Sequence, residues 1–165
     1  MDTSKPNFEL IIGLGNPDKK YENTYHNVGH LFADYLSSHM SHVTCHMLKS
    51  DVYMNESGAF VKKMLKKYGA KPEELLIAHD DSDITLGDYK FSFGRGAAGH
   101  HGIENIQAVL KTKNFWRLRI GIRPISPIGL IKLKRLKAGK FVLKKITAAD
   151  KKILGEIFKQ IDSKL

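Results

Sequence analysis

The chain has 165 residues, 42% of them hydrophobic, and a formal net charge of +10 at pH 7. These values fit a single domain over residues 1–165, long enough to bury roughly two thirds of its unfolded surface. The single cysteine, Cys45, excludes an internal disulfide, and no apolar run approaches the length of a membrane span. The first residues show neither a signal peptide nor an Arg-rich transit segment, so we expect a cytoplasmic protein.

The charge is divided unevenly along the chain. Residues 1–110 carry 11 Lys and Arg against 14 Asp and Glu, a balance of −3, whereas residues 111–165 carry 16 against 3, a balance of +13. A basic segment of this density is typical of a protein that binds a polyanion, most often nucleic-acid phosphate. The alternative is a lysine-rich surface that is merely solvated.

The first predicted element is a buried strand over residues 8–12, which ends in a glycine-permitted turn at 13–17. Apolar positions spaced by three and four residues predict an amphipathic helix over residues 28–40. Asn16 therefore lies in the turn after a strand, and His26 lies close to a helix start. An α/β protein builds a site in this way, at the carboxyl end of a strand.

Four potential zinc ligands follow the first helix: His39, His42, Cys45 and His46. Zinc sites usually show a tighter paired signature and a second ligand pair far downstream, which this chain lacks. We therefore expect a polar helix end and connector here, and neither a metal nor a cofactor.

The remaining elements alternate between helix and strand, which predicts a layered α/β domain. A polar run at 79–83 follows one of the strands, and a glycine-rich loop at 94–102 precedes one of the helices. The helices are expected at residues 55–68, 103–110 and 147–163, and the strands at 75–78, 89–93 and 117–122.

The polar residues that follow these elements suggest hydrolytic chemistry. A histidine that is oriented by a carboxylate takes a proton from water near neutral pH, and His26 with Asp80 would suit hydrolysis of an activated carbonyl. The amides of Asn16 and Asn55 would donate to an oxyanion or position the substrate and water. Because the chain has no Gly-x-Ser-x-Gly elbow, direct attack by water is favoured over a covalent intermediate. It also lacks a complete dinucleotide or P-loop fingerprint, which disfavours a nucleotide cofactor.

Six motifs follow one another along the chain: GLGNP, YENTYHNVG, YMNESG, HDDSDITLG, GRGAAGHHG and RLRIGI. Together and in this order they resemble the bacterial-type peptidyl-tRNA hydrolase family across about residues 8–124. This resemblance implies an α/β domain in which a mixed twisted β-sheet is sandwiched between α-helices, acting as a monomer without metal. It also implies cleavage of the ester between a peptide and the 3′ ribose of a prematurely released tRNA.

The resemblance assigns roles to particular residues of the predicted dyad. His26 matches the catalytic base and Asp80 the carboxylate that orients it, with Asp83 a second candidate for the carboxylate. Asn16 and Asn55 match the amides that position substrate and water.

The resemblance also implies substrate contacts outside the dyad. Tyr21 matches the aromatic residue that flanks the cleft, Met54 a wall residue, and Arg119 a basic residue that grips tRNA phosphate. Recognition would then use the shape and phosphates of the tRNA acceptor end, with little reading of bases. No membrane and no obligate protein partner are implied.

The chain departs from the family pattern at several positions. His101 stands where a substrate-binding asparagine is expected, and an imidazole cannot donate and accept at once as an amide does. Ser92 stands where a lysine would join Arg119 on phosphate, which leaves Lys90 and Arg95 as substitutes. Residues 40–49 are shorter than usual and are predicted to lack the strand or hairpin that precedes the YMN motif.

Two readings of the function remain open. The first is hydrolysis of peptidyl-tRNA by water that His26 activates. The second is a non-catalytic tRNA- or RNA-binding relative that keeps the fold and the basic face. We also expect residues 1–7 to be flexible, and residues 125–165 to form a basic C-terminal part that aligns only weakly with the family.

Overall fold

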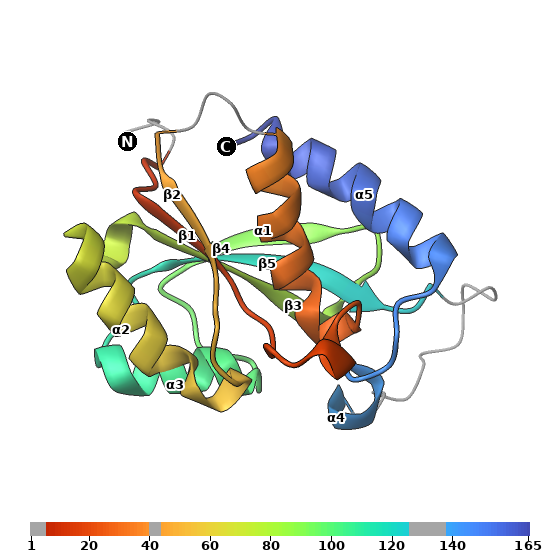
Figure 1. The fold of residues 1–165 in the computed structure, drawn as a ribbon, viewed down its shortest axis with the longest axis horizontal. Helices are drawn as coiled ribbons and strands as arrows, with labels where there is room; N and C mark the ends of the chain where they lie inside the picture. The colour runs from red at the N-terminus through yellow and green to blue at the C-terminus, as the bar shows by residue number, and fades with distance from the viewer. Residues whose placement is uncertain (1–5, 40–43, 126–137) are drawn as a thin grey trace.

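A computed structural model describes residues 6–39, 44–125 and 138–165 (Figure 1). Residues 1–5 of the expected flexible N-terminus and residues 126–137 of the basic C-terminal part lie outside the described residues. Five strands and five α-helices occur in the described parts of the chain. The strands are β1 (Leu10–Gly13), β2 (His46–Lys49), β3 (Leu75–Thr85), β4 (Tyr89–Phe93) and β5 (Trp116–Arg123), and the helices are α1 (Val28–His39), α2 (Ser57–Tyr68), α3 (His101–Leu110), α4 (Ala138–Phe141) and α5 (Ala148–Asp162).

The strands form one mixed sheet in the order β2-β1-β3-β5-β4. β1, β2, β3 and β5 are parallel, and only the edge strand β4 runs antiparallel to its neighbour β5. The chain passes from β1 to β2 on one side and then returns to β3 on the other side of β1. The strand order therefore reverses between β1 and β3, and α/β sheets bind ligands in the crevice outside the carboxyl ends of strands at such a point.

Helices cover both faces of the sheet, as the sequence predicts. α1 and α5 lie on one face and α2 and α3 on the other (Figure 1). Alternation along β3 supplies both cores, because successive side chains point to opposite faces. Leu76 and Ala78 pack with Phe32 of α1, whereas Leu75 and Ile77 belong to the core formed with α2 and α3. The predicted fold class, an α/β domain with helices on both faces of a mixed sheet, is confirmed.

Two glycines bring α1 close to the end of β1. A Cβ on Gly29 would lie 2.4 Å from the carbonyl oxygen of Ala78, and a Cβ on Gly13 would lie 2.1 Å from the carbonyl oxygen of Gly29. Real Cβ atoms do not approach backbone so closely, so only glycine permits this contact. The contact sets the first turn of α1, and with it the preceding His26, against β3.

The structure corrects three of the predicted boundaries. β3 does not end at Ala78 but continues to Thr85, because the backbone beyond Ala78 still pairs with β5. Residues 46–49 form β2, parallel to β1, where the sequence predicts a connector and a missing strand. Its two end residues are exposed and its two central residues are only half-buried, which explains why apolar periodicity does not reveal it. α3 begins at His101, two residues before the predicted start.

Candidate active site

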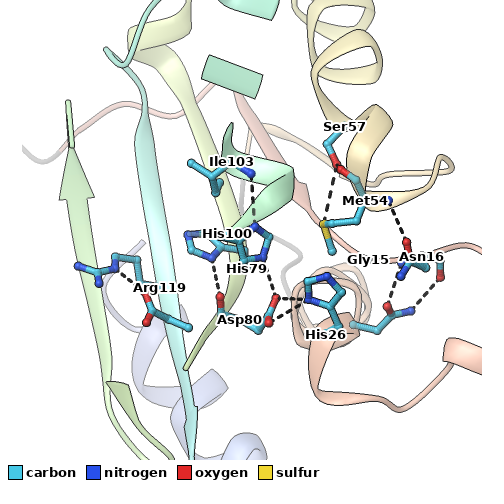
Figure 2. A network of polar contacts seen from close by, with 12 residues as sticks. Gly15, Asn16, His26, Met54, Ser57, His79, Asp80, His100, Ile103 and Arg119 are labelled. Atoms are coloured by element: carbon cyan, nitrogen blue, oxygen red, sulfur yellow. Dashed lines mark hydrogen bonds and ion pairs between the residues drawn. The ribbon is translucent and has the colours of Figure 1, made fainter. Parts of the chain in front are cut away.

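His26 and Asp80 are in contact just beyond the carboxyl end of β1, which pairs with Ala78 of β3. His26 lies in a 3-10 turn, Tyr25–Asn27, that leads directly into α1, and Asp80 lies in β3. The His26 Nδ1 is 3.0 Å from each carboxylate oxygen of Asp80 (Figure 2). The side chains are 14% and 3% exposed, so the dyad is largely shielded while His26 still reaches solvent.

The C-terminal part of the chain holds the backbone around His26. The His26 N–H donates to the Val142 carbonyl at 2.7 Å, and the Tyr25 N–H donates to the Lys144 carbonyl at 3.2 Å. Thr24 and Lys145 form an isolated antiparallel bridge beside these bonds. The weakly aligned part of the sequence therefore helps to position the histidine.

A second histidine, His100, also contacts Asp80. Its Nε2 lies 2.9 Å from Asp80 Oδ1, and its Nδ1 accepts a hydrogen bond of 3.3 Å from the Ile103 N–H (Figure 2). Because Nδ1 acts as acceptor, the hydrogen-bond network assigns the proton of a neutral His100 to Nε2, from which it donates to Asp80. His100 is the N-cap of α3. Sequence reasoning missed it, although it belongs to the same glycine-rich motif, GRGAAGHHG, as His101.

These contacts determine the ionisation of the dyad. Burial by itself favours the protonated carboxyl, but the two imidazoles hold the pKa of Asp80 well below its usual range. Burial by itself lowers the pKa of His26, yet the Asp80 charge and hydrogen bond outweigh it and leave that pKa raised. Asp80 is therefore ionised, and it makes His26 more basic than a free histidine.

A third histidine, His79, is buried next to the dyad and contacts both Asp80 and His100. It is 1% exposed, its Nδ1 donates to the Asp80 carbonyl at 2.7 Å, and its ring centroid is 4.6 Å from that of His100. Burial, the largest influence, holds the pKa of His79 well below its usual value, and the neighbouring Arg117 acts in the same direction. The His79 imidazole is therefore uncharged, and it packs against the ring of His100.

Asn16 lies in the loop that follows β1. Its backbone N–H and carbonyl bond reciprocally with the side-chain amide of Asn27, both at 2.9 Å. Its Oδ1 accepts from the Met54 N–H at 2.8 Å. The carbonyl end of the amide is thus occupied, and Asn16 Nδ2 makes no hydrogen bond within the described residues, which leaves it as a donor for a ligand.

The other residues expected at the substrate lie on separate elements and differ in exposure. Met54 is buried at 6% exposure and its N–H donates to Asn16, whereas Asn55, next to it in the same 3-10 turn, is exposed. Tyr21 is half-buried at the end of another 3-10 turn. The structure does not bring the ring of His101 to the dyad, since its side chain is 83% exposed and lies 3.3 Å from Glu104.

Arg119 lies beyond the dyad, on β5. Its Nε donates to Asp81 Oδ2 at 2.7 Å, and its side chain is 19% exposed (Figure 2). Lys90 is directly opposite Arg119 in the β4–β5 register, whereas Ser92 faces Arg117. Lys90, rather than Ser92, is therefore the cross-strand basic partner of Arg119. Asp83, the second candidate carboxylate, is exposed on β3, and its N–H donates to Asp81.

Potential metal ligands are gathered at the dyad. Among the described residues, one group of three ligating side chains has donor atoms that all lie within 4.8 Å of one another: His26, Asp80 and His100. The described part of the chain shows no such group around His39, Cys45 and His46, and His42 lies outside it.

A polar hollow of about 450 Å³ adjoins Asn16 on the side of β2, and His30 lies in its wall. His30 Nε2 donates to the Ser50 carbonyl at 2.9 Å, and the ring is packed so closely that a Cβ on Gly15 would lie 2.7 Å from it. Burial, the largest influence, lowers the pKa of His30 to about 4, with a smaller contribution from Lys49. His30 is thus kept neutral in the folded chain.

We expect the pKa of His30 to make stability depend on pH. A histidine that titrates near 6.5 when unfolded and near 4 when folded contributes fully above pH 6.5, and its contribution is lost as the pH falls towards 4. The free energy of unfolding should drop by up to about 2 kcal/mol from this group between pH 7 and pH 5. Urea denaturation of the wild type and of His30→Gln, whose amide still reaches Ser50, measures the difference. His39→Gln, at an exposed position, is the matched control; equal pH dependence in all three proteins would contradict the expectation.

No helix in residues 6–39, 44–125 or 138–165 combines the length and apolarity needed to cross a membrane.

Known proteins resemble the chain in sequence and in structure. A sequence model of the family described as peptidyl-tRNA hydrolase matches residues 10–165. The peptidyl-tRNA hydrolase of Bordetella parapertussis is 39% identical over an alignment 140 positions long, and the alignment covers 73% of this chain and 65% of that protein. The peptidyl-tRNA hydrolase of Aquifex aeolicus is 34% identical over an alignment 171 positions long, and the alignment covers 92% of this chain and 85% of that protein. The alignment thus spans just under two thirds of the Bordetella relative.

A crystal structure of peptidyl-tRNA hydrolase from Acinetobacter baumannii has a TM-score of 0.79 and 29% identity, with 95% of this chain and 86% of that chain covered. The resemblance of the motifs ends near residue 124, but the family match continues to residue 165. It therefore includes Val142 and Lys144, whose carbonyls accept hydrogen bonds from the backbone at His26 and Tyr25. Fold and sequence therefore agree, and the chain belongs to the bacterial-type peptidyl-tRNA hydrolase family.

Proposed function

We propose that the chain hydrolyses the ester between peptide and tRNA by water that His26 activates. The observation that carries this proposal is the His26–Asp80 contact, in which Asp80 engages Nδ1 and leaves Nε2 of His26 without a hydrogen bond among the described residues. An imidazole with its Nδ1–H on a buried carboxylate has its Nε2 lone pair available as a general base.

The reaction then proceeds in two proton transfers. His26 Nε2 accepts a proton from water while the water oxygen attacks the ester carbonyl, and negative charge develops on the carbonyl oxygen. The free Nδ2 of Asn16 and the amide of Asn55 donate to that oxygen or hold the substrate. Collapse breaks the carbon–oxygen bond to the ribose, whose 3′ oxygen takes the proton from His26. Asp80 remains ionised throughout and stabilises the imidazolium.

The remaining site residues contact the substrate in this proposal. Tyr21 and Met54 flank the cleft, and His101 meets the substrate from its exposed position at the start of α3. Arg119, with Lys90 across the strand, and the basic C-terminal third bind phosphates at the tRNA acceptor end. The protein acts as a monomer in the cytoplasm, with no membrane and no obligate protein partner.

One hydrolysis assay tests the proposed function. Wild-type protein is incubated with peptidyl-tRNA at neutral pH, with and without chelator, and the released peptide is measured. We expect turnover in both conditions, because His26 and Asp80 need no metal to activate water. Binding of tRNA without ester cleavage at high protein concentration would instead support the non-catalytic RNA-binding relative, which His101, Ser92 and the short 40–49 segment motivate.

Salt dependence tests the phosphate contacts. Because residues 111–165 carry a charge of +13, tRNA affinity should fall steeply as salt rises. Arg119→Gln should reduce the slope of log affinity against log salt by about one. Lys90→Gln should act in the same direction, whereas Lys71→Gln, at the opposite end of β3, should leave the slope unchanged. A salt-independent affinity, or equal slopes for all variants, would rule out the proposed phosphate contacts.

A further inference from the structure

The dyad and His100 bring three potential metal-ligating atoms close together. His26 Nδ1, an Asp80 carboxylate oxygen and His100 Nε2 all lie within 4.8 Å of one another (Figure 2). The two nitrogen–oxygen separations are 3.0 and 2.9 Å. Ligand atoms about 2.0 to 2.1 Å from a tetrahedral zinc ion are separated by about 3.3 Å. Small side-chain shifts would therefore bring these three atoms into coordination distance of one ion.

The donor set determines which ion fits. Asp80 is ionised and 3% exposed, and the two imidazoles come from separate elements, the turn before α1 and the N-cap of α3. Two imidazoles and one carboxylate suit Zn²⁺, Co²⁺, Ni²⁺ and Cu²⁺. Mg²⁺ and Ca²⁺ prefer oxygen ligands, so the Mg²⁺ present with tRNA would not compete strongly.

We propose that His26, Asp80 and His100 form a binding site for Zn²⁺ or a similar divalent transition metal, and that occupation of this site stops hydrolysis. The ion is an inhibitor in this proposal and not a cofactor. The inhibitory part rests on the proposed function, whereas the binding part does not.

The reason for inhibition lies in the protons of the two imidazoles. In the hydrogen-bonded site, His26 carries its proton on Nδ1 and keeps the Nε2 lone pair free. Coordination uses the Nδ1 lone pair, so the proton of neutral His26 must move to Nε2. That nitrogen then has no lone pair with which to accept a proton from water. His100 likewise moves its proton from Nε2 to Nδ1 and gives up its long 3.3 Å bond from the Ile103 N–H. No net proton is released, and the base is blocked.

Binding is tested with Co²⁺ on the full chain, because bound Co²⁺ reports a site of low coordination number through its visible absorption. We expect absorption that saturates at one equivalent and is lost on addition of Zn²⁺. His100→Asn should weaken Co²⁺ binding at least about tenfold, since one ligand is removed. Asparagine is a favoured N-cap, and circular dichroism checks that the variant is folded.

The matched control is the double variant His39→Gln/His46→Gln, which leaves all three ligands in place. It should keep the Co²⁺ absorption. Loss of absorption in this control, absence of absorption in the wild type, or an unchanged affinity in folded His100→Asn would each overturn the binding site.

Inhibition is tested by adding Zn²⁺ to the hydrolysis assay. We expect turnover to fall as the Co²⁺-binding site fills, to return with chelator, and to leave tRNA binding in place. Full turnover, or faster turnover, with the site filled would overturn the inhibitory part. If metal-free protein shows no turnover while the wild type binds Co²⁺ and His100→Asn does not, the proposed function fails but the metal site stands.

Discussion

His26→Ala should slow the release of peptide from peptidyl-tRNA by about 10² to 10⁴-fold, the usual contribution of a general base. The loss should appear in kcat rather than in tRNA affinity, because the phosphate contacts proposed for Arg119 and the C-terminal third do not involve the imidazole. Single-turnover hydrolysis measures the first quantity and direct tRNA binding the second.

The control for this substitution is His39→Ala. His39 is exposed at the end of α1 and bonds only within that helix among the described residues, to the Tyr35 carbonyl. It should keep wild-type turnover. Full residual turnover in His26→Ala would exclude His26 as the base, and a parallel loss of tRNA binding would assign it to substrate binding.

Asp80→Asn should also slow hydrolysis by about 10² to 10⁴-fold, by a different route. In a serine protease triad, replacement of the carboxylate by an amide keeps the geometry but stabilises the wrong tautomer of the histidine. Here His26 Nδ1 lies 3.0 Å from both carboxylate oxygens, so in either orientation the amide would place an N–H donor against the Nδ1–H of His26. That contact favours the His26 tautomer with its proton on Nε2, and the substitution also removes the negative charge that stabilises the imidazolium. A steady-state comparison with the wild type should show a large fall in kcat.

Asp83→Asn provides the matched control, and it tests the second carboxylate candidate directly. Asp83 is exposed on β3 and makes no contact with His26 in the described structure. Its substitution should leave kcat near that of the wild type. If kcat fell more in Asp83→Asn than in Asp80→Asn, Asp83 rather than Asp80 would be the carboxylate that orients His26. Circular dichroism and urea denaturation of Asp80→Asn separate a chemical defect from a folding defect, because the position is buried.

The sequence predicts the elements well where apolar periodicity and burial coincide. The helices near residues 28–40, 55–68 and 147–163 all form, as do the strands near 8–12 and 117–122. It fails where backbone pairing decides the element. β3 continues through polar residues because β5 pairs with it. β2 is a half-exposed edge strand that, among the described strands, pairs with β1 alone.

At the site, resemblance to a family pairs His26 with Asp80, and the structure brings the two into contact. It does not bring the ring of His101 to them, and the neighbouring His100 contacts Asp80 instead. Adjacent residues at a helix start point in different directions, so a motif names the position without showing which side chain turns inward. The same limit hides the support that Val142 gives to His26 from more than one hundred residues away.

The sequence by itself thus determined the α/β class, the basic C-terminal third and, through six motifs, the family. These properties are carried by composition, periodicity and local spacing. Only the tertiary structure decided that Asp80 is shared by two histidines, that His79 lies neutral beneath them, and that Lys90 faces Arg119. The physical reason is that these contacts join residues far apart in the chain, through sheet register, helix caps and burial. Such long-range contacts determine which imidazole nitrogen carries the proton and which side-chain atoms lie close together.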